Sequence, residues 1–265
     1  MIVSKEISNW IKSYAGEYNR DSLVIGISGG VDSSVVSTLC AMTELPVFVL
    51  TMPIRQKEDQ NSLSMKHGEW LVKKYNNVSH CIIPLDSVYN SFQDSLGSSF
   101  DNEHAFANTK SRLRMVTLHQ ISASKKGIVV GTGNKIEDFG VGFFTKYGDG
   151  GVDISPIADL MKSEVYSLGK ELGILQEILD APPTDGLWED GRTDKEQLGG
   201  LTYDELERSM KIEEQSILCI SKEESEKLIR YQDIRKANLH KMEPIPVFQR
   251  SNFLEKNDIK LWDDL

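Results

Sequence analysis

The chain of 265 residues has few cysteines, and the three it has form no recognisable pattern. Cys40, Cys81 and Cys219 lie far apart and lack the C-x-x-C spacing of a zinc site or a redox pair. Unpaired thiols fit a reducing compartment, where cysteine acts as a small core residue. These absences disfavour zinc and disulfide chemistry, and we expect a cytoplasmic protein.

Long apolar runs and a positive net charge are also missing. No stretch reaches the roughly 20 apolar residues that a membrane span needs. The N-terminal segment, which carries acids and has apolar residues at helical spacing, resembles neither a signal peptide nor a transit peptide. Lys and Arg number 30 against 40 Asp and Glu, a formal net charge of −10. Binding to a nucleic-acid backbone depends mostly on cationic side chains. We therefore expect a soluble protein with no nucleic-acid or membrane partner.

Short apolar segments alternate with longer segments of helical period in the first half of the chain. The predicted buried strands, each bounded by turn residues, are 23–27, 46–52, 80–85 and 127–132. The predicted helices between them are 33–42, 59–75 and 103–126. Alternation of this kind predicts right-handed βαβ units. The predicted fold class is therefore α/β, a doubly wound parallel sheet with helices on both faces.

After residue 153 the pattern predicts helices alone, at 162–172, 175–179, 202–213 and 222–240. Residues 180–200 are rich in Pro, Gly and Asp and have no periodicity. A long segment of this kind in a compact enzyme favours an active-site lid or disorder. We expect residues 1–265 to form one domain, with a nucleotide-binding core at about 20–160 and a helical part with the lid at about 161–265.

The segment VIGISGGVDSS, residues 24–34, places two adjacent glycines between a predicted strand and a predicted helix. Glycines let backbone N–H groups approach a ligand, and the helix directs its positive end at the loop, so phosphate binding is predicted. No GK[ST] follows at the Walker distance, and a GxGxxG is absent. An ordinary βα turn with Asp32 and Ser33 as helix caps is the alternative.

This loop resembles the SGGxDS fingerprint of the N-type ATP pyrophosphatases, which cleave ATP between its α and β phosphates. Residues 131–173 are similar to NAD synthetases, as are NTKSRLRM (108–115), APPTDGLW (181–188) and LHKMEPIP (239–246). The resemblance implies an adenine nucleotide alpha hydrolase-like fold. It also implies a ligase that amidates deamido-NAD to NAD with ATP, Mg²⁺ and ammonia. An adenylated intermediate would form, and AMP and pyrophosphate would be released.

The resemblance also implies roles for particular positions. The implied metal ligands are Asp32 and Glu137, and the implied catalytic residues are Asp149, near the ammonia, and Lys162. The implied ATP contacts are Gly26, Ile27, Ser28, Gly29, Gly30, Val31, Asp32, Ser33, Thr132, Lys162 and Thr184. The implied deamido-NAD contacts, some of them across a homodimer interface, are Arg112, Lys146, Asp153, His240 and Lys241.

Elementary chemistry supports these roles. A carboxylate that attacks the α-phosphate is repelled by it, so the site needs cations: Mg²⁺ on Asp32 and Glu137, together with Lys162. Ammonia attacks only when neutral, because ammonium has no lone pair, and Asp149 is suited to accept the proton. A closing lid over residues 180–200 would keep water from hydrolysing the adenylate.

Simpler explanations remain open for several of these residues. Glu137 and Lys162 could be solvated helix residues, and Asp149 could serve only the tight turn of GDGG. The stretch from Glu137 to Gly142 holds one residue more than in the best-known bacterial examples, so Asp138 is an alternative metal ligand.

Two further positions depart from the family pattern. Met242 follows Lys241, where the family usually has arginine, so one donor to the dinucleotide is in doubt. Thr51 stands where some members carry arginine, and Arg55 is a nearby substitute. Arg112 and Arg114 could also be a solvated face of a long helix, and the pair His240–Lys241 could be a polar tail.

Only about 20 residues precede the first predicted strand, so we expect no fused glutaminase domain and a dependence on ammonia or on a separate glutaminase. Two other functions compete. A tRNA-thiolating or tRNA-lysidine-type ligase would use the same loop, but the acidic charge opposes it. A non-catalytic nucleotide-binding module would not require Asp32, Glu137 and Lys162 together.

Overall fold

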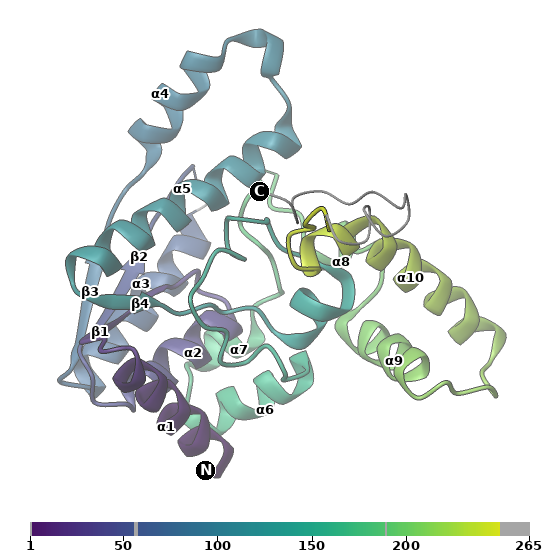
Figure 1. The fold of residues 1–265 in the computed structure, drawn as a ribbon, viewed down its shortest axis with the longest axis horizontal. Coiled ribbons are helices and arrows are strands. Elements are labelled where there is room, and N and C mark those ends of the chain that lie inside the picture. The colour runs from purple at the N-terminus through teal and green to yellow at the C-terminus, as the bar shows by residue number, and fades with distance from the viewer. Residues whose placement is uncertain (1, 56–57, 189, 250–265) are drawn as a thin grey trace, which may run out of the picture.

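The computed structural model describes residues 2–55, 58–188 and 190–249 (Figure 1). Its sheet has four parallel strands in the order β3-β2-β1-β4. Their bounds are β1 Ser22–Gly26, β2 Val47–Thr51, β3 Val78–Ile82 and β4 Gly127–Val129. In the register, Leu23 of β1 pairs with Val47 on one side and with Ile128 on the other. The predicted doubly wound parallel sheet is confirmed.

Both faces of the sheet are covered by helices, and the central strand β1 is buried on both. Leu23 and Ile25 pack in a core with side chains of α1 (Ile2–Glu17), α2 (Val31–Ala41) and α3 (Glu58–Lys74). Val24 points to the other face, where it packs in a core with side chains of α5 (Glu103–Ser124). Because successive strand side chains alternate between faces, a strand buried on both sides has a continuous apolar sequence.

The remaining predicted helices form close to their expected bounds, as α6 (Lys162–Leu172), α7 (Gln176–Asp180), α9 (Tyr203–Glu214) and α10 (Lys222–Met242). The third strand ends at Ile82 rather than at residue 85, since Pro84 has no amide hydrogen for a ladder. The elements α4 (Asp86–Leu96), η1 (Ser98–Phe100), η2 (Ile136–Val141) and α8 (Asp194–Gln197) were not predicted. The segment 180–200 is therefore not wholly irregular, because it contains α8.

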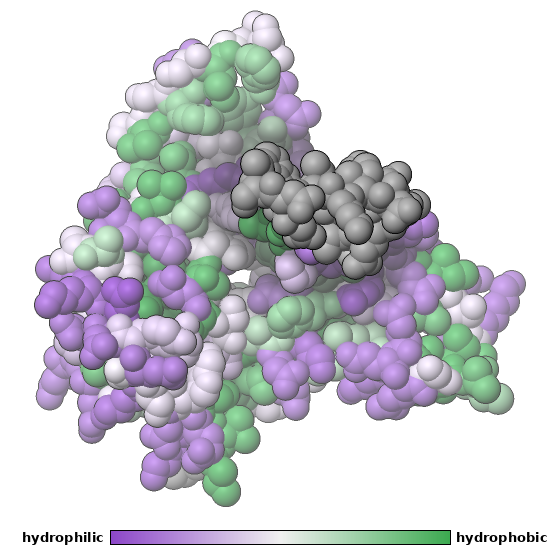
Figure 2. Space-filling view, viewed as in Figure 1, coloured by the Kyte–Doolittle hydropathy of each residue, from purple (hydrophilic) through white to green (hydrophobic). Residues whose placement is uncertain are grey.

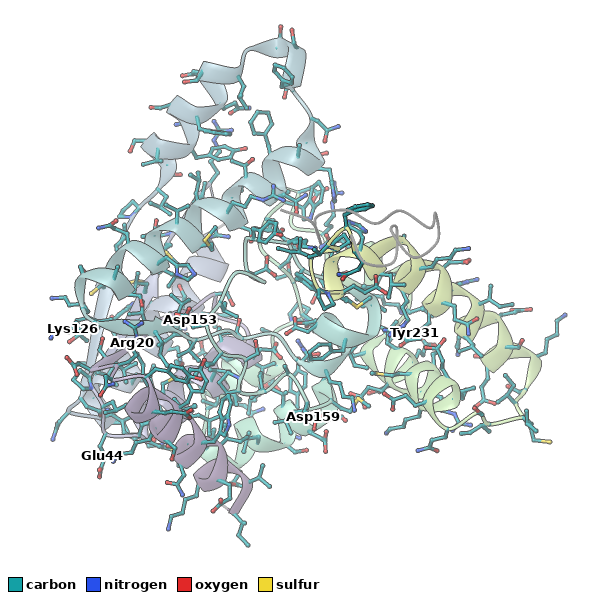
Figure 3. All side chains as sticks on the ribbon, viewed as in Figure 1. Arg20, Glu44, Lys126, Asp153, Asp159 and Tyr231 are labelled. Atoms are coloured by element: carbon teal, nitrogen blue, oxygen red, sulfur yellow. The ribbon has the colours of Figure 1, made fainter. Side chains whose placement is uncertain are left out.

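A second, smaller core lies among the C-terminal helices. Tyr231 of α10, labelled in Figure 3, is fully buried there with Leu206 of α9. The turn after β4 contributes Ile136 and Val141 from a π-helix, η2 (Ile136–Val141). This core attaches the C-terminal helices to the loop that follows β4.

One arm of the molecule extends away from the sheet. It consists of α4 and the first half of α5 (Figure 1). Among the helices of residues 2–55, 58–188 and 190–249, none is long and apolar enough to cross a membrane.

A buried histidine makes the stability of the fold depend on pH. His67 of α3 is 0% exposed, its Nε2 lies 2.9 Å from the Ser37 hydroxyl of α2, and its ring stacks on Trp70. Burial, with a smaller contribution from the nearby His80, lowers the pKa of His67 to about 4, and a hydrogen bond with the Ser34 backbone opposes this shift. Because the folded pKa lies below the unfolded value of about 6.5, folding favours the neutral ring. The stabilisation is complete above that value and is lost as the pH falls toward 4.

We predict that the free energy of unfolding of the natural chain falls by about 2 kcal/mol more between pH 7 and pH 5 than that of His67→Gln. Urea denaturation at both pH values measures the difference. Equal pH dependence in the two proteins would contradict the burial of a neutral imidazole.

Candidate active site

A cavity of about 410 Å³ opens at the carboxyl ends of the strands, and it is lined by Gly26 at the end of β1 and by Val130 and Gly131 directly after β4. Ligands bind at this edge of an open α/β sheet, where loops from neighbouring strands diverge. All eleven positions that the sequence predicts for ATP line this one cavity. Glu137 and Asp149 line it as well. The tertiary structure thus brings together residues that are up to about 158 positions apart in the chain.

The glycine loop is held in shape by its own hydrogen bonds. Gly29 has a φ of +90°, a conformation that side chains with a Cβ rarely adopt. The Gly30 amide donates to the Ser28 hydroxyl at 3.2 Å, and the Ser33 hydroxyl donates to the Gly30 carbonyl at 3.1 Å. Helix α2 begins at Val31, so its unpaired N–H groups and positive end face the cavity. The loop is preorganised for an anion.

A buried lysine lies between two carboxylates at this loop. Lys162 Nζ lies 2.5 Å from Asp32 Oδ2 and 3.0 Å from Glu137 Oε1, and its side chain is only 4% exposed. Burial by itself lowers the pKa of Lys162, but the two carboxylates outweigh it and raise that pKa above its usual range. Burial also raises the pKa of Glu137. Two acids share one cation, so the simpler view of Lys162 as a surface residue is wrong.

The π-helix η2 explains how Glu137 reaches this lysine. In a π-helix residues five apart share a face, and Ile136 and Val141 are both fully buried in the second core. Glu137, one position after Ile136, is turned to the cavity. Asn134 fixes both metal-ligand candidates, because its amide donates to Asp32 Oδ1 at 3.0 Å and its Oδ1 accepts from the Glu137 N–H at 3.1 Å.

Asp138, the alternative ligand, lies elsewhere. Its carboxylate packs against Gly133, where an added Cβ would come within 2.2 Å of Oδ1. Burial, together with the charge of Glu137, raises the pKa of Asp138 to about 8. Across the part of the chain that the structure describes, the residues that line the cavity include Glu137 and do not include Asp138. The geometry favours Glu137.

Asp149 both accepts hydrogen bonds within the GDGG turn and lines the cavity. Its Oδ1 accepts from the Ser111 hydroxyl at 2.6 Å and from the Thr145 amide at 3.0 Å, so it stabilises the GDGG turn. It also lines the cavity beside Gly148. The turn explanation therefore holds, and it does not exclude a role toward a ligand.

Three of the five predicted deamido-NAD residues are joined in series by hydrogen bonds outside the cavity lining, and a fourth lies beside them. Arg112 Nη2 donates to the Lys146 carbonyl at 3.3 Å, and Lys146 Nζ donates to the His240 carbonyl at 2.8 Å. Lys241 Nζ donates to the Phe144 carbonyl at 2.7 Å. Burial lowers the pKa of Lys241, and Asp149 opposes that shift. The cationic cluster thus adjoins the turn that carries Asp149.

The fifth, Asp153, is not brought to this cluster. Its Oδ2 accepts from the Val129 amide at 2.7 Å, at the edge of β4. Figure 3 labels it over the strands, on the opposite side of the picture from Tyr231 of α10. Its observed hydrogen bond stabilises the sheet edge.

The structure also shows the contacts of Thr51, Arg55 and Met242, the positions discussed above as departures from the family pattern. Thr51 is buried, and its hydroxyl lies 2.9 Å from His80 Nε2, so it does not replace an arginine at the cavity. Arg55 Nη2 donates to Asn90 of α4 at 2.5 Å. A Cβ on Gly142 would lie 3.5 Å from Met242 Cε, so this methionine packs against the end of η2.

Sequence reasoning missed three further residues at the cavity or beside it: Asn134, Asp194 and Tyr203. The Tyr203 hydroxyl lies 2.6 Å from Glu137 Oε1 and 2.9 Å from Asp194 Oδ2. Burial, together with Glu137, raises the pKa of Asp194 to about 7. Tyr203 and Asp194 each follow a threonine that caps a helix in the structure, and no sequence motif marks either residue as part of a site.

The predicted lid segment contributes Pro182, Pro183 and Thr184 to the cavity lining. It is attached to α5, because the buried Lys110 donates from Nζ to the Leu187 carbonyl at 2.9 Å. Thr184 itself accepts from the Gly186 amide at 3.3 Å. Residue 189 of this segment lies outside the described residues.

The phosphate loop, its position at the edge of a parallel sheet and the buried lysine define a nucleotide-binding α/β enzyme. The family model of NAD synthase matches residues 3–245. The chain belongs to the NAD synthase family, so it is a ligase that forms a carbon–nitrogen bond in NAD biosynthesis.

Individual relatives agree with this assignment. The chain is 36% identical to the NH(3)-dependent NAD(+) synthetase of Carboxydothermus hydrogenoformans, over 77% of this chain and 82% of that protein. It is 33% identical to that of Sulfurisphaera tokodaii, over 94% and 89%. The structure of NMN synthetase from Francisella tularensis is similar at a TM-score of 0.81 and 32% identity, covering 92% of this chain and 96% of that one.

We predict that Glu137→Gln lowers turnover on the order of a thousandfold, because it removes one of the two carboxylates that share Lys162. Asp138→Asn, its matched control in the next position, should change turnover by less than about tenfold. Steady-state kinetics with saturating ATP and Mg²⁺ measure both, and melting curves check the fold. A larger loss of turnover in Asp138→Asn than in Glu137→Gln would show that Asp138, and not Glu137, is the carboxylate that the reaction needs.

Proposed function

We propose that the protein converts deamido-NAD to NAD in this cavity, with ATP and ammonia. Formation of an adenylated intermediate would release pyrophosphate, and attack of ammonia on that intermediate would release AMP. The single observation that carries the proposal is Lys162 held between Asp32 and Glu137 beside the glycine loop. The phosphates of ATP would lie at loop residues 26–33, and Thr132 and Thr184 would contact the nucleotide from opposite walls. Residues 1–265 would act as one domain, in the cytoplasm, where free thiols stay reduced.

The donor set of this site fits Mg²⁺. Asp32 and Glu137 offer carboxylate oxygens, the ligand type that this ion prefers together with phosphate. Within the described residues no three acids, histidines or cysteines gather into a complete metal cage, which agrees with an ion shared with a nucleotide. Bound there, Mg²⁺ would supply positive charge at the phosphates. Lys162 would release its carboxylates in part and donate to the phosphate under attack.

Asp149 is the proposed acceptor of the proton from ammonia. Its Oδ1 is held by Ser111 and by the Thr145 amide, so the carboxylate keeps one orientation at the cavity wall. The nitrogen donor is ammonia, as in the NH(3)-dependent relatives. The segment 180–200 would cover the site and exclude water. The hydrogen bond from Lys110 to the Leu187 carbonyl attaches this segment to α5, at the wall of the cavity.

A second substrate deserves a direct comparison. The Francisella relative is an NMN synthetase, and it is 32% identical over 92% of this chain. The cationic cluster of Arg112, Lys146, His240 and Lys241 lies outside the cavity lining, so it is the part of the protein that would distinguish a dinucleotide from a mononucleotide.

The expected products are NAD, AMP and pyrophosphate in equal amounts from ATP, Mg²⁺, ammonium and deamido-NAD, because attack falls on the α-phosphate. Chromatography of the products measures the ratio. Below the pKa of ammonium, each increase of one pH unit should lower the total ammonium concentration that is required about tenfold, since only neutral ammonia reacts. ADP among the products would overturn the proposal. Faster turnover of nicotinate mononucleotide would favour the second substrate.

We also propose a homodimer formed through the projecting arm. Val88, Phe92 and Leu96 recur at every fourth position of α4 and are 49%, 43% and 37% exposed, and Phe100 is 67% exposed. Figure 2 shows hydrophobic residues gathered on this arm. A self-complementary patch of this kind fits a two-fold interface. A second copy would cover it and extend the binding surface near Arg112 of α5.

We predict that Phe92→Asp converts the dimer to a monomer, because the charge would be buried without a partner. Sedimentation velocity at assay concentration measures the mass. Leu218→Asp is the control, since Leu218 is 95% exposed in the loop between α9 and α10. A fully active monomeric natural chain would contradict the proposal.

A further inference from the structure

One arginine of the cavity has no role in the assignments above. Arg114 of α5 lines the cavity, and its Nε donates to the Met52 carbonyl at 3.0 Å. Its Nη2 is buried without a hydrogen-bond partner. A buried N–H of this kind loses its hydration and gains nothing in return, so it is costly in the unliganded protein.

The helix explains why this arginine, and not its neighbour, reaches the cavity. Ser111, Arg114, Met115 and Leu118 all line it, a spacing of three or four residues that marks one face of a helix. Arg112 lies on another face, is exposed and contacts Lys146 instead. The helical period therefore places Arg114 at the cavity and Arg112 on the exposed surface of α5.

Two acids lie near Arg114, but both are occupied by other donors. Asp149 Oδ1 accepts from Ser111 and from the Thr145 amide. Asp185 accepts from the Leu187 amide at 3.0 Å and from the Trp188 indole at 3.3 Å. Burial lowers the pKa of Arg114 to about 10, with Asp149 and Asp185 opposing, so the group stays cationic at neutral pH. Its Nη2 edge is left for an incoming anion.

We propose that Arg114 binds the carboxylate of the nicotinate ring and so distinguishes the acid substrate from its amide product. Guanidinium and carboxylate match in shape and charge. Apolar side chains of Met52, Met115 and Leu118 line the same part of the cavity, where a flat ring would pack. The phosphates of ATP have their own donors in the glycine loop, and two nearby carboxylates repel a multiply charged phosphate more than a single carboxylate. When the carboxylate becomes an amide, the ionic contact is lost and the product leaves.

This inference rests on the proposed function, and its test separates the two. Calorimetry measures the affinities of the natural chain and of Arg114→Gln for deamido-NAD, for NAD and for ATP. We expect Arg114→Gln to lose about ten- to a hundredfold in affinity for the acid and little for the amide. Its KM for deamido-NAD should rise by the same factor, while ATP affinity is unchanged. The nicotinate and nicotinamide mononucleotides form a second acid–amide pair for the same comparison.

Controls keep each outcome informative. Arg230→Gln, on the exposed surface of α10, should leave all affinities unchanged. Arg114→Lys keeps the charge without the planar fork and should lose part of the acid preference, which tests the idea should Arg114→Gln fail to fold. An unchanged acid-to-amide ratio in the folded variants, or an equal loss toward ATP, would overturn the role of Arg114. A natural chain that binds neither dinucleotide nor mononucleotide acids would instead overturn the proposed function.

Discussion

The pairing of Lys162 with both Asp32 and Glu137 is the interaction on which the site depends. A buried ammonium is stable only beside compensating charge, and two carboxylates this close are stable only beside a cation. The three residues come from α2, η2 and α6, so this contact fixes the positions of the glycine loop, the turn after β4 and the C-terminal helices relative to one another. In the structure this lysine lies at the cavity, beside the glycine loop, with both carboxylates in contact with its ammonium.

The surrounding structure supports this arrangement from two sides. The parallel sheet holds the loops after β1 and β4 at one edge, and the second core holds η2 through Ile136 and Val141. Asn134 then donates to the Asp32 carboxylate at 3.0 Å and Tyr203 to the Glu137 carboxylate at 2.6 Å, while Asn134 also accepts from the Glu137 backbone N–H at 3.1 Å. Stability and function are therefore coupled, because a change in the second core would move Glu137.

The cavity has two parts with different chemistry. The loop side presents backbone N–H groups and Lys162, which suit phosphates. The α5 side presents Arg114, Asp149 and apolar side chains, which suit a ring with one charged group. The segment 180–200 also lines the cavity, with Ala181, Pro182 and Thr184 among its contributions.

The sequence by itself determined the fold class, the phosphate loop and the family, because these depend on local periodicity and on short contiguous motifs. It also named Glu137 and Lys162 as candidates, and both line the cavity, although a lysine at the start of a helix could equally have been exposed. Only the tertiary structure decided that Glu137 rather than Asp138 faces the cavity, since the wide π turn sets that direction. It likewise decided that Arg114 points inward and Arg112 outward, because the phase of a long helix is set by what packs against it.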